Sequence, residues 1–101
     1  MAMEDEEVFT ADEVERAERN VAQARERAAL AGFLAAASFE ESARSHERLA
    51  AVQERTVRQG VSHTEAHRES AMFHRKAAAE DYELAELKRK ESAADLAIDS
   101  D

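Results

Sequence analysis

The chain has 101 residues, which is enough for one domain. Proline is absent, glycine occurs twice, and alanine, glutamate and arginine dominate, so long helices are favoured over any β-rich fold. Because alanine supplies much of the 44% apolar fraction, a monomeric core would be thin. Association with another copy or a partner is the usual remedy for such a chain.

The net charge of −9 belongs to the two ends of the chain. Residues 1–15 carry seven acidic groups and residues 91–101 carry four, with no basic residue in either segment, whereas residues 16–90 hold all 14 basic residues against 12 acidic ones. We expect residues 1–9 to form a disordered acidic N-terminus and residues 98–101 an acidic tail. A single helical domain is expected between them, over residues 10–97.

Composition also bears on the location of the protein. Cysteine is absent, which excludes disulfides. The acidic start MAMEDEEVF is the reverse of a signal-peptide n-region, and the longest apolar run, at 28–37, is too short to cross a bilayer. These features predict a cytoplasmic protein without membrane contact.

The first helix is expected to span about residues 10–59. Thr10 and Glu13 form a capping-box pattern, and Phe9 and Val14 occupy the positions of a hydrophobic staple. Gly32 and a second capping-box pattern at 38–41 allow a kink or a break near 32–38. No loop-forming cluster lies there, so one long helix is favoured over a three-helix bundle.

The first helix is expected to end at Gly60, because glycine suits the left-handed residue that terminates helices. Ser62 and Glu65 then form another capping-box pattern, which predicts a second helix over about residues 62–97. The fold class is therefore all-α, and a long antiparallel helical hairpin is the favoured architecture.

An internal repeat supports this organisation. The segment ESARSHERLAA at 41–51 returns as ESAMFHRKAAA at 69–79, a shift of 28 residues or four heptads, so both copies present equivalent helical faces. The repeated residues Ala43, Ala50, Ala71 and Ala78 are expected to let the two helices approach closely.

A turn at 60–61 places residue i roughly level with residue 121 − i. This register predicts that Leu49 lies near Met72 and Phe73, and Leu34 near Leu87, so that large apolar residues meet. The first helix would extend past the second over about residues 10–23 and leave Val14 and Val21 uncovered. We expect an interaction seam made of Val14, Val21, Leu30, Leu34, Phe39, Leu49, Val52, Phe73, Ala77, Leu84 and Leu87.

The four histidines are the candidates for metal binding or pH sensing. His63 and His67 are spaced i, i+4 on one helical face, a geometry that suits zinc, but the next position on that face is Ser70 rather than a carboxylate. The register brings His46 level with His74, where protonation of both near pH 6 would place like charges together. The favoured interpretation is that the imidazoles flank the helices as hydrogen-bonding groups, with no bound metal or cofactor.

Patterns for catalysis or nucleic-acid binding are missing. HTEAH at 63–67 has its glutamate one place away from that of the HExxH zinc-protease motif, and there is no phosphate-binding loop or cysteine nucleophile. Arginines alternate with glutamates at helical spacing, and LKRK at 87–90 is the only basic cluster. We therefore expect neither an enzyme nor a nucleic-acid-binding protein.

Two resemblances follow from these motifs. The repeated Glu-Ser-Ala-x-x-His phrase, over residues 38–82, resembles small Ala/Arg/His-rich helical proteins of unknown function from actinobacteria. Length, hairpin and the spacing of Tyr82 and Glu86 resemble the helical-hairpin substrates of type VII secretion, although that family's Trp-x-Gly turn is replaced by Arg58-Gln59-Gly60. This second resemblance implies secretion without a cleavable signal peptide, with Tyr82 and Glu86 as the export signal.

The favoured functional hypothesis is a non-catalytic module for protein–protein interaction. Self-association into a dimer is the simplest form, and a helical protein partner is the other. The type VII-secreted hairpin and a histidine-based metal or pH sensor are the alternatives.

Overall fold

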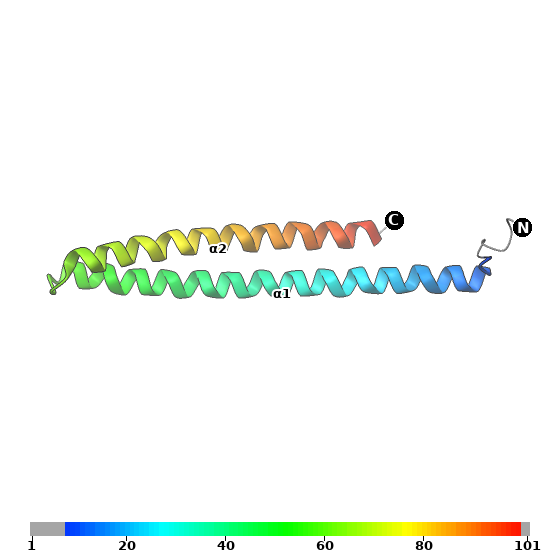
Figure 1. The fold of residues 1–101 in the computed structure, drawn as a ribbon, viewed down its shortest axis with the longest axis horizontal. Helices are drawn as coiled ribbons and strands as arrows, with labels where there is room; N and C mark the ends of the chain where they lie inside the picture. The colour runs from blue at the N-terminus through cyan, green and yellow to red at the C-terminus, as the bar shows by residue number, and fades with distance from the viewer. Residues whose placement is uncertain (1–7, 100–101) are drawn as a thin grey trace, which may run out of the picture.

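The computed structural model describes residues 8–99, which form two helices, α1 (Ala11–Arg58) and α2 (Thr64–Asp99). The helices run antiparallel along each other, and no strand occurs within residues 8–99 (Figure 1). The predicted antiparallel hairpin is confirmed. Because α1 is continuous through residues 32–38, the three-helix alternative is wrong. The expected disorder of the N-terminus concerns mainly residues 1–7, which lie outside the described range.

The start and end of α1 are set by the residues that the sequence indicated. Thr10 has extended backbone angles, and its Oγ1 accepts a hydrogen bond from Glu13 N at 3.1 Å while Glu13 Oε2 accepts one from Thr10 N at 3.3 Å. Gly60 has a φ of 68°, and its amide donates to Val57 O at 3.1 Å. The capping box and the left-handed glycine are therefore confirmed.

The start of α2 differs from the expectation by two residues. The helix begins at Thr64 rather than at 62, directly after His63, which has a left-handed φ of 66°. His63 O accepts the first helical hydrogen bond, from His67 N at 3.0 Å, and Thr64 Oγ1 donates to Val61 O at 2.9 Å. The chain thus reverses through two left-handed residues, Gly60 and His63, and a second capping box at Ser62 does not start the helix.

The two helices meet along a line of small residues spaced seven apart, which we call the inner seam. Each of its members is at most 4% exposed; they are Ala29, Ala36, Ala43 and Ala50 of α1 and Ala71, Ala78, Ala85 and Ser92 of α2. The predicted role of the repeated alanines is confirmed. Contact is so close that a Cβ added to Gly32 would lie 1.9 Å from Ser92 Oγ.

The contacts between the helices agree with the predicted register. His46 was expected level with residue 75 and contacts His74, and Gln53 was expected level with residue 68 and contacts His67. Gly32 faces Ser92, three residues beyond its expected partner. As predicted, α1 extends past the end of α2, and we call residues 10–23 the overhang (Figure 1).

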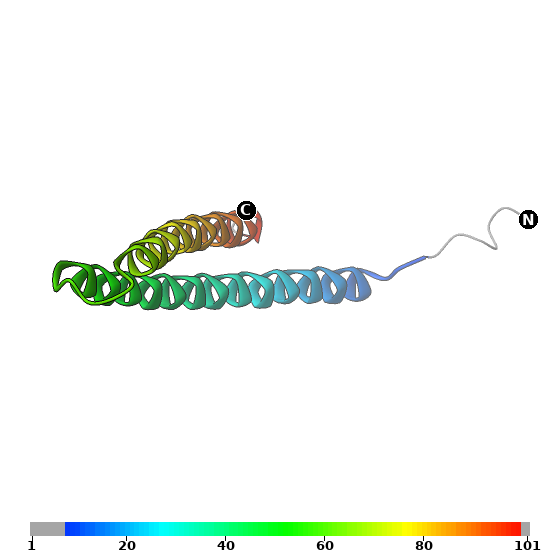
Figure 2. The same ribbon diagram turned by 60° about the vertical axis from the view of Figure 1, so that its left-hand side comes forward.

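The hairpin is a single layer of two helices (Figure 2). Its extents are 83 × 28 × 14 Å, and its radius of gyration of 24.1 Å is about twice the roughly 13 Å of a compact chain of this length. Within residues 8–98 no large side chain is fully buried. The molecule therefore has a contact line between its helices but no core of large apolar side chains.

The inner seam is not formed by the large apolar residues that the register places level with one another. Leu34 and Leu49 of α1 and Met72, Phe73 and Leu87 of α2 are all exposed. At the positions of the inner seam only side chains as small as alanine fit between the helices, so the larger residues lie beside the seam and stay at least partly exposed.

Candidate interaction surface

One side of α1 carries a second line of residues with the spacing of a helix–helix contact. The line runs from Val14 to Val52 in alternating steps of three and four residues. None of its twelve residues is charged: Val14, Ala17, Val21, Ala24, Ala28, Ala31, Ala35, Ser38, Ser42, Ser45, Leu49 and Val52. Ten of these residues are exposed, and Ala35 and Ser45 are half-buried. We call this line the outer face of α1. Alternating steps of three and four keep all twelve residues on one side of a helix over its whole length.

The opposite edge of the hairpin is charged. Three glutamates of α1 recur every seven residues on this edge and contact α2. Each lies four residues, or about one helical turn, after an alanine of the inner seam: Glu40, Glu47 and Glu54. Glu54 Oε1 lies 2.6 Å from Arg75 Nη2, Glu47 accepts a hydrogen bond from Tyr82, and Glu40 pairs with Arg89.

These contacts raise the pKa of the Tyr82 hydroxyl, chiefly through the hydrogen bond to Glu47. The hydrogen bond from Arg75 lowers the pKa of Glu54. The edge is therefore a ladder of polar contacts that holds the helices together from one side.

The polar ladder fixes where the apolar residues of α2 lie. In an antiparallel helix pair, equivalent flanking positions of the two helices meet on the same edge. Since the ladder occupies one edge, the flanking positions of α2 on the other edge lie beside the outer face of α1. The flanking positions of α2 on this edge include Ala77, Leu84 and Ile98, and the positions farther from the inner seam include Phe73 and Leu87. Ala77 is half-buried and the other four residues are exposed. Both helices thus contribute apolar residues to one side of the hairpin.

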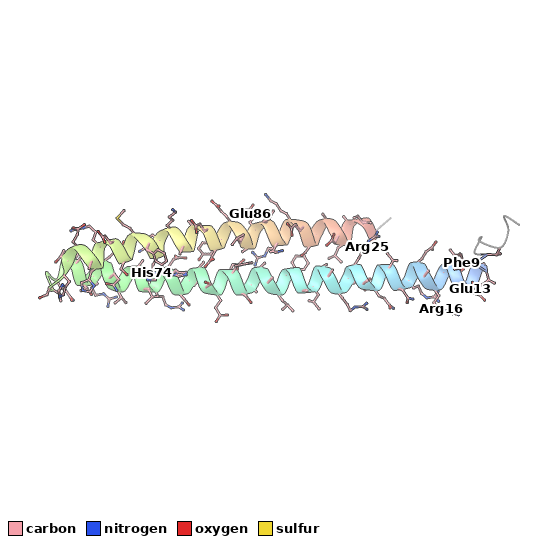
Figure 3. The ribbon with its side chains drawn as sticks, viewed as in Figure 1. Phe9, Glu13, Arg16, Arg25, His74 and Glu86 are labelled. Carbon is pink, nitrogen blue, oxygen red and sulfur yellow. The ribbon has the colours of Figure 1, made fainter. Side chains whose placement is uncertain are left out.

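The overhang continues the outer face beyond the end of α2. It carries a groove of about 610 Å³ whose lining is half apolar and half polar or charged: Phe9, Val14, Ala17, Val21 and Ala22, with Glu13, Arg16, Glu18, Asn20 and Arg25. Figure 3 shows Phe9, Glu13 and Arg16 at this end of α1, past the last turn of α2. Residues of α2 end before they could cover this part of α1, so its apolar side chains are open to solvent.

The structure sorts the predicted interaction seam into groups. Eight residues lie on the apolar side of the hairpin: Val14, Val21, Leu49 and Val52 on α1, and Phe73, Ala77, Leu84 and Leu87 on α2. Phe39 is half-buried between the helices, Leu34 borders the outer face, and Leu30 points to another side of α1. Their contact with a second protein stays a prediction.

The histidines fall into three separate environments. His46 Nδ1 lies 2.8 Å from His74 Nδ1 with the rings stacked at 5.0 Å, and Figure 3 shows His74 directed from α2 toward α1. One Nδ1 must donate and the other accept, so the pair shares one proton across this contact. His67 donates from Nδ1 to Gln53 Oε1, and His63 lies in the turn.

A carboxyl group, that of Asp81, lies beside this histidine pair. Its Oδ2 lies 3.9 Å from His46 Nε2 and is buried without a hydrogen bond among the described residues. Phe73 contacts both imidazoles edge-on. No set of three or more histidine or acidic side chains within the described part of the chain is arranged to hold a metal ion. Of the four histidines considered as candidate ligands, only His46 and His74 are therefore brought together.

Tyr82 and Glu86 lie one helical turn apart on α2. Tyr82 contacts Glu47 of α1, whereas Glu86 points away from α1 and pairs with Lys90 at 3.2 Å (Figure 3). No helix among the described residues is long and apolar enough to cross a bilayer. The role of this pair in export stays a prediction.

Sequence reasoning missed Ala29, Ala36, Ala85 and Ser92 of the inner seam and the buried carboxylate of Asp81. A signal for the first four was present, because stepping by seven from Ala43 and Ala50, and from Ala71 and Ala78, leads to each of them. Comparison of the chain with known protein families, with characterised proteins and with solved structures finds no significant match.

Proposed function

We propose that this protein is a non-catalytic helical module that acts through protein–protein contact, and that its first partner is a second copy of itself. The observation that carries the proposal is the outer face of α1, a line of twelve residues without a charge on a helix where charged residues are otherwise frequent. A charge-free line at coiled-coil spacing is typical of a surface that packs against another helix.

The exposed surface supports the same proposal. The chain exposes 7708 Å², whereas a compact monomer of 11.2 kDa exposes about 5,700 Å². The excess of about 2,000 Å² per chain is larger than the roughly 800 Å² that each partner buries in a standard protein–protein interface, so one chain has enough exposed surface for such a contact. A hairpin without large buried side chains gains most from an association that covers its apolar side.

The mass in solution tests the proposal. Light scattering coupled to size exclusion, at neutral pH and over a tenfold range of concentration, is expected to give twice the chain mass of 11.2 kDa. Leu49→Glu places a charge on the outer face and is expected to shift the mass toward that of a monomer. Leu30→Glu is the matched control, because Leu30 is more exposed, at 60% against 46%, and lies off that face. A well-folded wild-type monomer over the whole range would refute self-association.

A further inference from the structure

The outer face of α1 is complementary to itself when it is read in the opposite direction. Its large side chains lie near the two ends, and its middle consists of alanine and serine. If two copies of α1 run antiparallel and are centred on residue 33, Val14 lies opposite Val52, and Ala17 opposite Leu49. The small residues between them permit the same close approach as the inner seam. This centring uses all twelve residues of the face, whereas a shift by one heptad leaves residues at each end without a partner.

The residues that border the outer face agree with this arrangement. Those on its free side recur every seven residues and include Glu13, Arg27, Leu34, Glu41 and Arg55. In the antiparallel pair centred on residue 33, Glu13 lies beside Arg55 of the other copy, and Arg27 beside Glu41. Leu34, which is 60% exposed, meets its own counterpart at the twofold axis. Arg27 and Glu41 make no ion pair within the described hairpin, so both charges are available to the second copy.

The charges at the two ends of the hairpin select the same orientation. The overhang, residues 10–23, carries four acidic and two basic groups. The turn end, residues 48–76, carries six basic and three acidic groups. An antiparallel dimer places the acidic overhang of one copy along the basic turn end of the other. A parallel dimer would place two acidic overhangs side by side, which is unfavourable.

We propose that two copies pair through the outer faces of α1 in an antiparallel, twofold-symmetric dimer centred near residue 33, in which the overhang of each copy docks on the turn end of the other. Phe73, on the apolar side near the turn, is then level with residues 18–19 of the second copy, next to Ala17 in the lining of the groove of the overhang. This arrangement accounts for the overhang, because the second copy covers the part of α1 that α2 does not reach. This inference rests on the proposed self-association.

Site-directed cross-linking tests the orientation, and the absence of cysteine makes every introduced thiol unique. Val14→Cys and Val52→Cys chains are mixed, equilibrated and treated with a short bismaleimide. A cross-linked dimer is expected only in the mixture, because two copies of residue 14 lie about 57 Å apart in the antiparallel pair. Arg44→Cys with Leu30→Cys, two positions that lie on another side of α1 and are not opposed in this pair, is the control for random collision.

Each result of the cross-linking decides one question. Cross-linking of Val14→Cys with itself would show a parallel pair and overturn the inference. Failure of the mixture to cross-link, in samples that light scattering shows to be dimeric, would also overturn it while leaving self-association intact. A monomeric mass for the unmodified chain would overturn both proposals together.

A charge exchange provides an independent test. Arg27→Glu and Glu41→Arg each place like charges together in the antiparallel pair, and each is expected to weaken dimerisation on the order of tenfold. The combined variant is expected to restore the wild-type dissociation constant. Arg44→Glu, on another side of α1, is expected to leave it unchanged. Additive weakening in the combined variant would refute the pairing of residues 27 and 41 across the dimer.

Discussion

Replacing Gly32 by alanine tests how closely the two helices approach at the inner seam. In the interior of an exposed helix, this replacement stabilises by about 1 kcal/mol, because alanine is the better helix former. Here the added Cβ would lie 1.9 Å from Ser92 Oγ, 3.2 Å from Ser92 Cβ and 3.7 Å from Lys88 O. The first distance is far inside van der Waals contact, and overpacking of this kind costs about 1–3 kcal/mol.

The sign of the effect should therefore depend on residue 92. With Ser92 in place, Gly32→Ala is expected to be neutral or to destabilise by up to about 2 kcal/mol. Ser92→Ala removes the oxygen and leaves the 3.2 Å distance to Cβ as the only tight contact, which a shift of a few tenths of an ångström relieves. In that background, Gly32→Ala is expected to stabilise by about 1 kcal/mol, which gives a coupling of about 1–3 kcal/mol between the two positions.

Urea unfolding followed by circular dichroism at 222 nm measures these differences, with every variant at one chain concentration because association contributes to stability. Ala37→Gly is the control for helix propensity, since Ala37 is exposed on α1. It is expected to cost about 1 kcal/mol with either residue at 92. If Gly32→Ala stabilised the wild-type chain as much as the Ser92→Ala chain, the close approach at this point would be refuted.

Three further predictions follow from the turn, the histidine pair and the polar ladder. Gly60→Ala is expected to destabilise the hairpin by about 1 kcal/mol in the same urea assay. The new methyl group meets no atom within 4 Å, so the cost comes from the backbone φ of 68°, which disfavours alanine. An unchanged midpoint would argue against the left-handed turn. His46→Ala is expected to lower the melting temperature at neutral pH, because it removes the Nδ1 partner of His74 and the ring stacked on it. A melting temperature equal to that of the wild type would contradict this role. Glu47→Gln is expected to lower the pKa of Tyr82, because it removes the charge of the carboxylate that accepts the Tyr82 hydrogen bond, and absorbance titration of the only tyrosine reads this directly.

Helix boundaries and register were predictable because they depend on local signals. Thr10 and Glu13 fix one end of α1, Gly60 fixes the other, and the position of the turn determines which residues lie level across the hairpin. The start of α2 was less predictable. Ser62 has the sequence of an N-cap, but left-handed backbone angles at His63 move the helix start to Thr64, and histidine is not a residue whose type indicates that conformation.

The identity of the buried residues was harder to predict. Burial of a large apolar side chain such as Leu49 or Phe73 stabilises a fold more than burial of alanine does. A prediction that considers a single copy of the chain therefore places the large residues between the helices. The structure puts alanines there, and alanine is also common at exposed positions, so residue type alone does not distinguish the two. Strict spacing by seven does distinguish them, since Ala29 and Ala36 continue the series that includes Ala43 and Ala50.

The inner seam has a consequence for how uniquely the hairpin is aligned. Since its small residues recur every seven positions, sliding one helix along the other by seven residues would again set alanine against alanine, and the alanines do not distinguish the two alignments. The turn and the intervening polar positions do, because a slip would rebuild the short connection between Arg58 and Thr64, and only the observed alignment joins His46 to His74 and Gln53 to His67. The alignment is therefore specified at the turn and by these polar contacts, among several of similar packing. If both were removed, a mixture of slipped hairpins is expected before an unfolded chain.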